Sequence, residues 1–295
     1  MRRALVLAAL MAAGMGMTLA VSGFQAPAGT DAKTVELQKI KDNLYVATGG
    51  GGNSAIFITD LGVVIVDTKL AGWGQPLMAK IKTMTDKPVA TIINTHAHSD
   101  HVGSNEFFGT AVEVVAHENT RLTMDKMDAF KGTKVNFLPK LMFKDKMSLG
   151  AGKDKIELYY FGAGHTNGDA WVVFPAARVV HAGDMFAGKQ PPLADTINGG
   201  SALAYPDSLE KAFTGVKNVD TIITGHSTLM PWKDLGTYAE FTRELRQVVV
   251  NGFDHGLSVS EIADAWTLPA KYGGYTAPPE RVKAVVQAMV GELTR

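Results

Sequence analysis

The eight residues NTHAHSDH (94–101) carry three of the chain's eight histidines together with one aspartate. The apolar stretch 89–93 before them is typical of a β-strand, so we expect the histidines on a loop at the end of that strand. There the first two histidines can point one way, while Asp100 and His101 point to a neighbouring position. Imidazole nitrogens and carboxylate oxygens are zinc ligands. Taken alone, the segment fits two adjacent metal sites, a single site or a surface cluster.

Three more ligand-type residues follow predicted strands. They are His165, Asp184 and His226, which come after the strands 156–161, 178–181 and 219–224. Each has a glycine nearby that lets the backbone turn sharply. Loops at strand ends are where binding and catalytic residues gather. Four strand ends that carry ligand-type residues predict one shared metal centre.

The rest of the chain alternates predicted strands and helices. Further strand patterns occupy 35–40, 44–48, 54–59, 63–66, 112–116 and 170–174. Helical spacing is found at 76–84, 207–216, 235–251, 258–266 and 279–293. The strands come in two batches that mix hairpins with helical crossovers, and there is neither a Pro/Ser linker nor a fixed-period repeat. This pattern favours a single α/β unit with two sheets.

Residues 118–146 have a helical pattern that is broken at Gly132 and Pro139. Methionines are spread through the segment 122–147, at positions 124, 127, 142 and 147. The favoured interpretation is a pair of helices whose methionines fill gaps in the core. A mobile lid over the active site is the alternative.

Composition narrows the classes of partner. The chain has 29 acidic and 29 basic residues and no run of Lys or Arg, so it lacks the basic face that a nucleic-acid partner needs. Cysteine is absent, which excludes disulfides and thiolate ligands. A metal site must therefore be built from nitrogen and oxygen.

The N-terminal sequence predicts export. Arg2 and Arg3 precede an uncharged apolar run at 4–21, and Ala26-Pro-Ala28 follows it. A charged region, an apolar region and an A-x-A site in this order are typical of a secretory signal peptide, here 1–28. An uncleaved membrane anchor is the alternative. We expect the mature part, 29–295, to be periplasmic or secreted, without stable membrane association.

Together these motifs resemble the metallo-β-lactamase superfamily of binuclear hydrolases, over the mature chain to about residue 240. The resemblance implies one domain at 29–295 with C-terminal helices, folded as an αββα sandwich of two mixed sheets with the metals at one edge. By position, His96, His98 and His165 match the first metal site, Asp100, His101 and His226 match the second, and Asp184 matches the bridging carboxylate. Two zinc ions per chain are implied, with iron or manganese as alternatives. Asp67 matches an acidic residue that supports the metal-binding loop, although it could equally cap the segment that follows it.

Such a centre would hydrolyse a small-molecule substrate. A water held between two divalent cations loses its proton near neutral pH and becomes the nucleophile, and Asp100 is placed to orient it and to shuttle the proton. Aspartate at 184, where β-lactamases usually have cysteine or serine, resembles the lactonase, glyoxalase-like and general hydrolase branches. The segments 161–169, 181–184 and 198–201 look most like an exported, β-lactamase-like or cyclase-like branch. The expected reaction is cleavage of a cyclic amide, as in a β-lactam, with a lactonase or esterase and a glyoxalase-II-like thioesterase as alternatives.

Two other classes stay open, an iron-dependent oxygenase and a non-catalytic metal-binding module. The pocket is expected between the glycine loop 49–52, the methionine-rich segment and the stretch 189–205. Candidate substrate contacts are Lys189, Tyr205 and Trp232, with Lys189 facing a substrate carboxylate, although packing or surface roles are the alternative. His117, His181 and His255 follow no ligand pattern and are expected to be structural. The sequence leaves the oligomeric state open.

Overall fold

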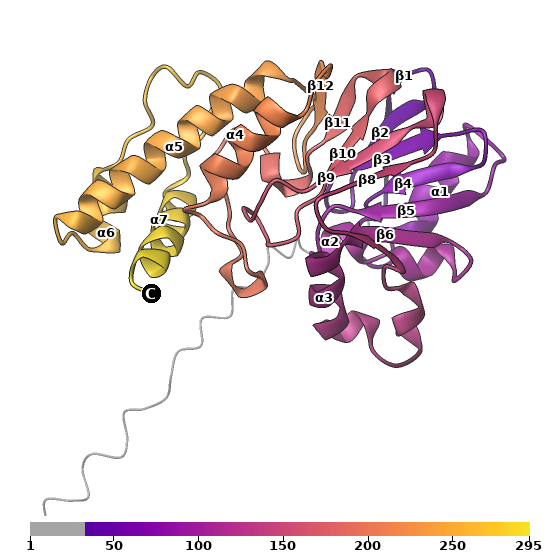
Figure 1. The fold of residues 1–295 in the computed structure, drawn as a ribbon, viewed down its shortest axis with the longest axis horizontal. Helices are drawn as coiled ribbons and strands as arrows, with labels where there is room; N and C mark the ends of the chain where they lie inside the picture. The colour runs from indigo at the N-terminus through magenta and orange to yellow at the C-terminus, as the bar shows by residue number, and fades with distance from the viewer. Residues whose placement is uncertain (1–32) are drawn as a thin grey trace, which may run out of the picture. The chain divides into compact units, whose positions relative to one another are not determined.

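Two β-sheets face each other in the computed structural model of the protein, and helices cover their outer faces (Figure 1). The structure describes residues 33–295, so the signal peptide predicted at 1–28 lies outside the described residues. The layer order helix, sheet, sheet, helix confirms the predicted αββα sandwich.

The first sheet has seven strands that follow one another in chain order. Its strands are β1 (Glu36–Lys41), β2 (Leu44–Thr48), β3 (Ser54–Ile58), β4 (Val63–Val66), β5 (Val89–Asn94), β6 (Glu113–His117) and β7 (Leu141–Phe143). Neighbours are antiparallel from β1 to β4 and parallel from β4 to β7. All four residues of β4 are buried, because the second sheet packs on one of its faces and a helix on the other.

The second sheet has six strands in the order β13-β12-β11-β10-β9-β8. They are β8 (Lys146–Leu149), β9 (Ile156–Tyr159), β10 (Trp171–Phe174), β11 (Val179–His181), β12 (Thr221–Ile223) and β13 (Met230–Pro231). β11 and β12 are parallel, and the other neighbours are antiparallel. Both sheets are therefore mixed, as predicted.

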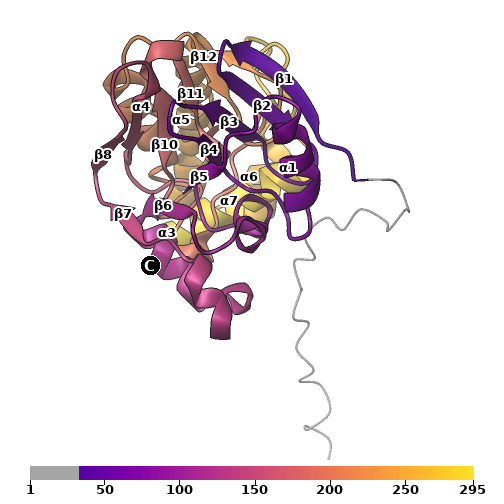
Figure 2. The ribbon, with the colours of Figure 1, turned by 90° about the vertical axis from the view of Figure 1, so that its right-hand side faces the viewer.

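Seven α-helices accompany the sheets in the described part of the chain. They are α1 (Gly74–Lys82), α2 (Ser99–Val102), α3 (Glu118–Lys126), α4 (Tyr205–Gly215), α5 (Lys233–Asp254), α6 (Val259–Ala265) and α7 (Pro279–Leu293). In Figure 2, α1 lies against the first sheet, and the C-terminal helices lie behind, on the side of the second sheet. Within residues 33–295, no helix combines the length and the apolar character needed to cross a bilayer.

Apolar side chains fill the space between each pair of layers. Between the sheets, Phe57 of β3 contacts Phe174 of β10 with ring centroids 5.0 Å apart. Leu77 and Ile81, one helical turn apart on α1, are buried against the outer face of the first sheet. On the other side α4 and α5 pack against the second sheet, where Tyr238 of α5 is buried.

The prediction of two helices over 118–146 is wrong beyond α3. The chain continues from α3 as the 3-10 turns η2 (Asp128–Phe130) and η3 (Gly132–Phe137) and then forms β7 and β8, one in each sheet. Gly132 has a positive φ of 60°, and Pro139 disfavours helical backbone before it, so the amphipathic spacing does not continue as a helix. Met124 is buried beside the loop after β5, whereas Met142 is 44% exposed.

Strand direction places the functional loops at one rim of the sandwich. β4 and β5 are parallel neighbours, so their carboxyl ends lie at the same edge of the first sheet. In the second sheet β9, β11 and β12 all run in one direction, because β10 is antiparallel to both β9 and β11. The loops that follow these five strands meet at this rim, which we call the ligand rim.

Candidate metal centre

All seven predicted ligands lie together at the ligand rim. Four come from the loop after β5 and from α2, where His98 is the extended N-cap residue (φ −68°, ψ 145°). The others come from the loop between β9 and β10, from the 3-10 turn η6 (Gly183–Phe186) and from the loop after β12. Their donor atoms form three overlapping groups, each within 4.8 Å: His96, His98 and His165; His96, His101 and Asp184; Asp100, His101 and His226.

The inner ring nitrogens of the first group face one another. The outer nitrogen of His98, Nε2, donates to the Asp195 carboxylate at 2.7 Å, and the outer nitrogen of His165, Nδ1, donates to the Leu193 carbonyl at 2.7 Å. In the neutral form that binds metals, each ring has one N–H, which these outer bonds use, so the inner nitrogens of both rings then hold lone pairs. These two nitrogens are only 2.8 Å apart. Lone pairs this close repel each other, and a cation that accepts both removes the repulsion. These side chains therefore fit a metal ion.

His96 also uses its outer nitrogen for a hydrogen bond and turns its inner nitrogen toward the cluster. The Thr95 hydroxyl donates to Asp67 at 2.7 Å, so His96 Nδ1 donates to the Thr95 oxygen at 3.0 Å. The Nε2 lone pair of His96 then faces His98 at 3.2 Å. Burial lowers the pKa of His96 well below its ordinary value, and burial lowers the pKa of His165 to about 4. Both rings are therefore neutral at pH 7, which is the form that binds metals.

Asp184 lies between the two ends of the cluster. Its Oδ2 is 3.6 Å from His165 Nε2 and 3.2 Å from His226 Nε2, and its Oδ1 is 3.4 Å from His101 Nε2. Oδ1 is buried without a hydrogen-bond partner, which is costly for a carboxylate and is a second feature that fits a metal ion. Burial would raise the pKa of Asp184, but the neighbouring His101 and His226 hold it well below its usual range.

Asp100 and His226 are, together with His98, the most exposed members of the cluster. Asp100 Oδ2 lies 3.3 Å from His226 Nε2 and 3.5 Å from His101 Nε2. The two side chains are 26% and 37% exposed, whereas His101 is fully buried. Solvent therefore reaches the cluster at these side chains and not at His101.

Asp67 joins β4 to the ligand loop. One carboxylate oxygen accepts the Thr95 amide at 2.8 Å, and the other accepts the Thr95 hydroxyl and His101 Nδ1, both at 2.7 Å. Burial alone would lower the pKa of His101, but the carboxylates of Asp67 and Asp184 raise it well above the ordinary value. These hydrogen bonds orient the His101 ring, which is the contribution that the resemblance implies for Asp67.

Asn53 holds two of the ligand-bearing loops in place, a role that the sequence did not predict. Its amide donates to Gly225 O at 2.7 Å, and its side chain donates to Thr224 O and Ser227 O at 2.9 and 2.7 Å. Its carbonyl accepts His181 Nε2 at 3.0 Å. Asn53 thus ties the first sheet to the ends of β11 and β12, which carry ligands. Its place directly after four glycines is the only signal in the sequence.

Lys69 was also missed, because a lysine after an apolar strand is normally exposed. It is fully buried, and its ammonium donates to Ala47 O and Gly52 O at 2.6 Å each. Burial lowers the pKa of Lys69 to about 7. The lysine thereby holds the glycine loop against α2, where the Gly52 amide donates to Asp100 O at 3.2 Å.

The three predicted substrate contacts have different surroundings. Tyr205 is fully buried and donates its hydroxyl to Asp184 O at 2.7 Å, so it supports the ligand turn, and the expectation of a substrate contact is wrong. Trp232 packs against Phe213 with ring centroids 5.7 Å apart and does not line the cleft at His226. Lys189 does line that cleft, which has a volume of about 510 Å³.

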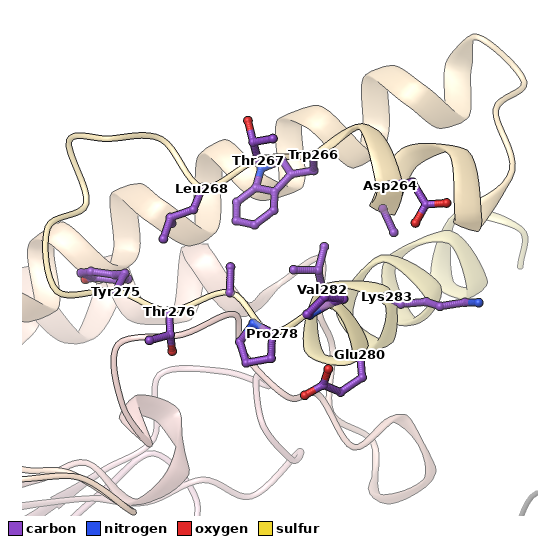
Figure 3. A pocket seen from close by; sticks show the side chains of 13 residues that line it. Asp264, Trp266, Thr267, Leu268, Tyr275, Thr276, Pro278, Glu280, Val282 and Lys283 are labelled. Carbon is purple, nitrogen blue, oxygen red and sulfur yellow. The ribbon is translucent and has the colours of Figure 1, made fainter.

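The remaining histidines are satisfied within the chain. His117 Nε2 donates to Lys144 O at 2.8 Å, His181 donates to Asn53 O, and His255 Nδ1 donates to Asn251 O at 2.7 Å. A separate groove of about 860 Å³ lies among the C-terminal helices, where Trp266 faces Val282 and Leu268 lies over the segment of Tyr275 and Thr276 (Figure 3). None of the seven candidate ligands lines it.

Known proteins share both the sequence pattern and the fold. The metallo-beta-lactamase type 2 of Elizabethkingia meningoseptica is 27% identical over 236 residues, which cover 74% of this chain and 87% of the relative. The metallo-beta-lactamase type 2 of Bacillus cereus is 23% identical over 209 residues, which cover 65% of this chain and 77% of the relative.

Two solved structures are similar in fold. A metallo-beta-lactamase from Pontibacter korlensis has a TM-score of 0.62 and 21% identity, and it covers 71% of this chain and 99% of its own. The DIM-1 metallo-beta-lactamase has a TM-score of 0.58 and 20% identity. The matched part covers 70% of this chain and 97% of the DIM-1 chain. The family model of the metallo-beta-lactamase superfamily matches residues 47–226, the range that holds both sheets' ligand loops. The chain therefore belongs to the metallo-beta-lactamase superfamily, whose members are generally metal-binding hydrolases.

Proposed function

We propose that the protein is a metal-dependent hydrolase that cleaves a cyclic amide or ester bond in a small molecule, with two zinc ions as its cofactors. The convergence of lone pairs on His98 and His165, together with the partnerless Oδ1 of Asp184, carries this proposal. Iron and manganese accept the same ligand types and remain the alternatives.

The residues of the cluster divide into holding and proton-handling groups. His96, His98 and His165 would hold one ion, Asp100, His101 and His226 would hold the other, and Asp184 lies close enough to both groups to be shared. When bound, divalent ions lower the pKa of water and polarise the scissile carbonyl. Asp100 is the more exposed of the two carboxylates in the cluster, so it could orient the attacking water and receive its proton. No thiol takes part, because the chain has no cysteine.

Two bonds are candidates for the reaction. The names of the relatives from Elizabethkingia and Bacillus support a β-lactam amide. The ion pair between Lys189 and Asp234 in the cleft supports an uncharged lactone or ester, because the lysine is already neutralised.

The test combines metal analysis with a substrate panel. Mass spectrometry of the purified protein should find two metal equivalents per chain, and the panel should include nitrocefin, a homoserine lactone and a lactoylglutathione thioester. We expect turnover of the amide or the lactone. Full metal occupancy without turnover of any of the three would refute the proposed reaction.

Asp184→Ala tests the shared carboxylate. We expect the variant to lose one metal equivalent and most of its activity, because two groups of ligands lose a common partner. An unaffected variant would mean that Asp184 is not shared.

We also propose that the chain is exported, on the strength of the signal-like sequence at 1–28. The intact mass of the protein from a periplasmic fraction should correspond to a chain that starts near residue 29. A full-length mass would contradict cleavage.

A further inference from the structure

The cleft beside His226 holds a charged pair that takes no part in the proposed bond cleavage itself. Lys189 and Asp234 both line it, and Lys189 is the one lysine or arginine among the described lining residues. The backbone joins this wall to the candidate centre, because the His226 amide donates to Ala187 O at 3.1 Å, two residues before Lys189. A substrate bound at His226 therefore lies next to the pair.

The pair is well fixed. Lys189 Nζ lies 2.8 Å from Asp234 Oδ2, and the side chains are only 30% and 17% exposed. The Lys189 carbonyl accepts the Thr276 amide at 3.0 Å, and the ammonium lies 6.0 Å from the centre of the Tyr275 ring. Asp234 stands in the first turn of α5, where the helix dipole favours a negative charge. Both partners are thus held in place.

A fixed pair changes how the cleft treats charged substrates. A free lysine would attract a substrate carboxylate, but this lysine is already neutralised at hydrogen-bond distance. An incoming carboxylate has to share the ammonium with Asp234, and the two like charges repel each other in a partly desolvated cleft. An uncharged ester or lactone meets no such repulsion.

We propose that Asp234 is a specificity-determining residue, which pairs with Lys189 and thereby selects uncharged substrates over those that carry a carboxylate. This inference rests on the proposed function, since it concerns the substrate of the same site. Removal of the Asp234 charge should free Lys189 and open the cleft to anions.

The test uses Asp234→Asn and a substrate pair that differs in one charge, nitrocefin and its methyl ester. We expect the ratio of kcat/KM for nitrocefin to that for the ester to rise about tenfold, mainly through a lower KM for nitrocefin. The double variant Lys189→Met/Asp234→Asn should show no rise, because the gain requires a free lysine. An unchanged ratio in Asp234→Asn, or the same rise without Lys189, would overturn the proposal.

The control and a second readout separate this inference from the proposed reaction. Asp207 is also in the first turn of a helix and pairs with Arg246 at 2.9 Å, so Asp207→Asn should leave the ratio unchanged. Calorimetry with benzoate and methyl benzoate needs no turnover, and Asp234→Asn should bind benzoate about tenfold more tightly than the wild type does. Tighter benzoate binding without any hydrolysis would support the inference and refute the reaction. Equal benzoate affinity in both proteins would refute the inference.

Discussion

Each histidine of the first ligand group is oriented by a different acceptor. His98 donates to a carboxylate, His165 to a backbone carbonyl and His96 to a hydroxyl. The outer hydrogen bond decides which nitrogen keeps its lone pair, and so it decides where each ring can bind a metal. Among these acceptors Asp195 alone carries a charge, so the hydrogen bond that orients His98 is a charge-assisted one.

We expect Asp195→Asn to lower the affinity for one metal equivalent about tenfold or more, because His98 loses its charged acceptor. Asparagine keeps the size of the side chain and can still accept the hydrogen bonds of the 3-10 turn η7 (Thr196–Asn198). Competition with a chromophoric chelator measures the affinity. Asp220→Asn, which breaks an exposed ion pair with Arg178, is the control and should bind both equivalents normally. Equal affinity in the two variants would contradict the orienting role.

Lys69 leads to a prediction about pH. Its pKa is about 7 in the folded protein and about 10.5 when unfolded, so between these values the unfolded state binds more protons. The free energy of unfolding should therefore rise with pH in this window, by up to about 1.4 kcal/mol per pH unit from this group. Lys69→Met lacks the contribution. From pH 7 to pH 9, the wild type should gain about 2 kcal/mol relative to the variant.

Guanidinium unfolding of both proteins at pH 7, 8 and 9, with metals chelated, checks this difference. Other groups titrate in both proteins, so the comparison isolates Lys69. Parallel pH profiles would show that the buried ammonium does not titrate in this range.

At the scale of elements, the glycine loop 49–52 is held by its neighbours rather than by its own side chains. Lys69 fixes the carbonyl of Gly52, and the amide of Leu70 donates to Gly50 O at 2.9 Å. A Cβ atom at Gly52 would collide with the ring of His101. The loop therefore needs glycine at position 52, where the backbone packs directly against the His101 ring.

We expect Gly52→Ala to displace His101, to weaken binding of one metal equivalent and to destabilise the fold by about 1–3 kcal/mol. Gly273→Ala is a matched control, because a Cβ there meets nothing within 4 Å. Metal stoichiometry and thermal unfolding of the two variants give the comparison. If Gly52→Ala retains both metals at wild-type affinity, the loop has room for a methyl group beside His101.

Most elements could be predicted because their apolar patterns are long and their ends carry turn residues. α5 repeats buried positions every three or four residues from Leu235 to Val249, and periodicity alone locates it. β7 and β13 could not be found, since strands of three and two residues have no measurable period. The helix predicted after α3 was wrong for another reason. There the pairing of β7 and β8 with strands of the two sheets overrides the helical spacing.

The candidate metal ligands could be predicted, but the residues that hold them in place through hydrogen bonds could not. His96 to His101 carry the signal in their spacing, and a glycine marks each of the other ligands. Asp195 and Asn53 act through hydrogen bonds to residues 97 and 171 positions away, which no local pattern encodes.

At the scale of the whole molecule, the candidate centre joins the two sheets. Four of its ligands follow β5 of the first sheet, and three follow strands of the second. A metal bound here holds the two halves of the sandwich together, so binding stabilises the folded state as a whole. At a metal concentration of about 100 times Kd, the gain is about 2.7 kcal/mol.

Removal of the metals should therefore lower Tm by about 5 °C or more, and added zinc should restore it. Thermal unfolding with and without a chelator measures the shift. Asp184→Ala is the control and should respond less, because it lacks a ligand that both halves use. An equal Tm with and without metal would mean that the centre does not hold the sheets together.

The opposite rim of the sandwich has tight turns in place of ligands. The turn between β3 and β4 and the turn between β10 and β11 lie side by side there, and Leu61 at the tip of the first is 90% exposed. The candidate metal ligands and the tight turns thus lie at opposite ends of the same strands. A foreign peptide grafted beside Leu61 would sit a full strand length from the chemistry, which makes this turn a natural anchoring point for immobilising the protein on a solid support.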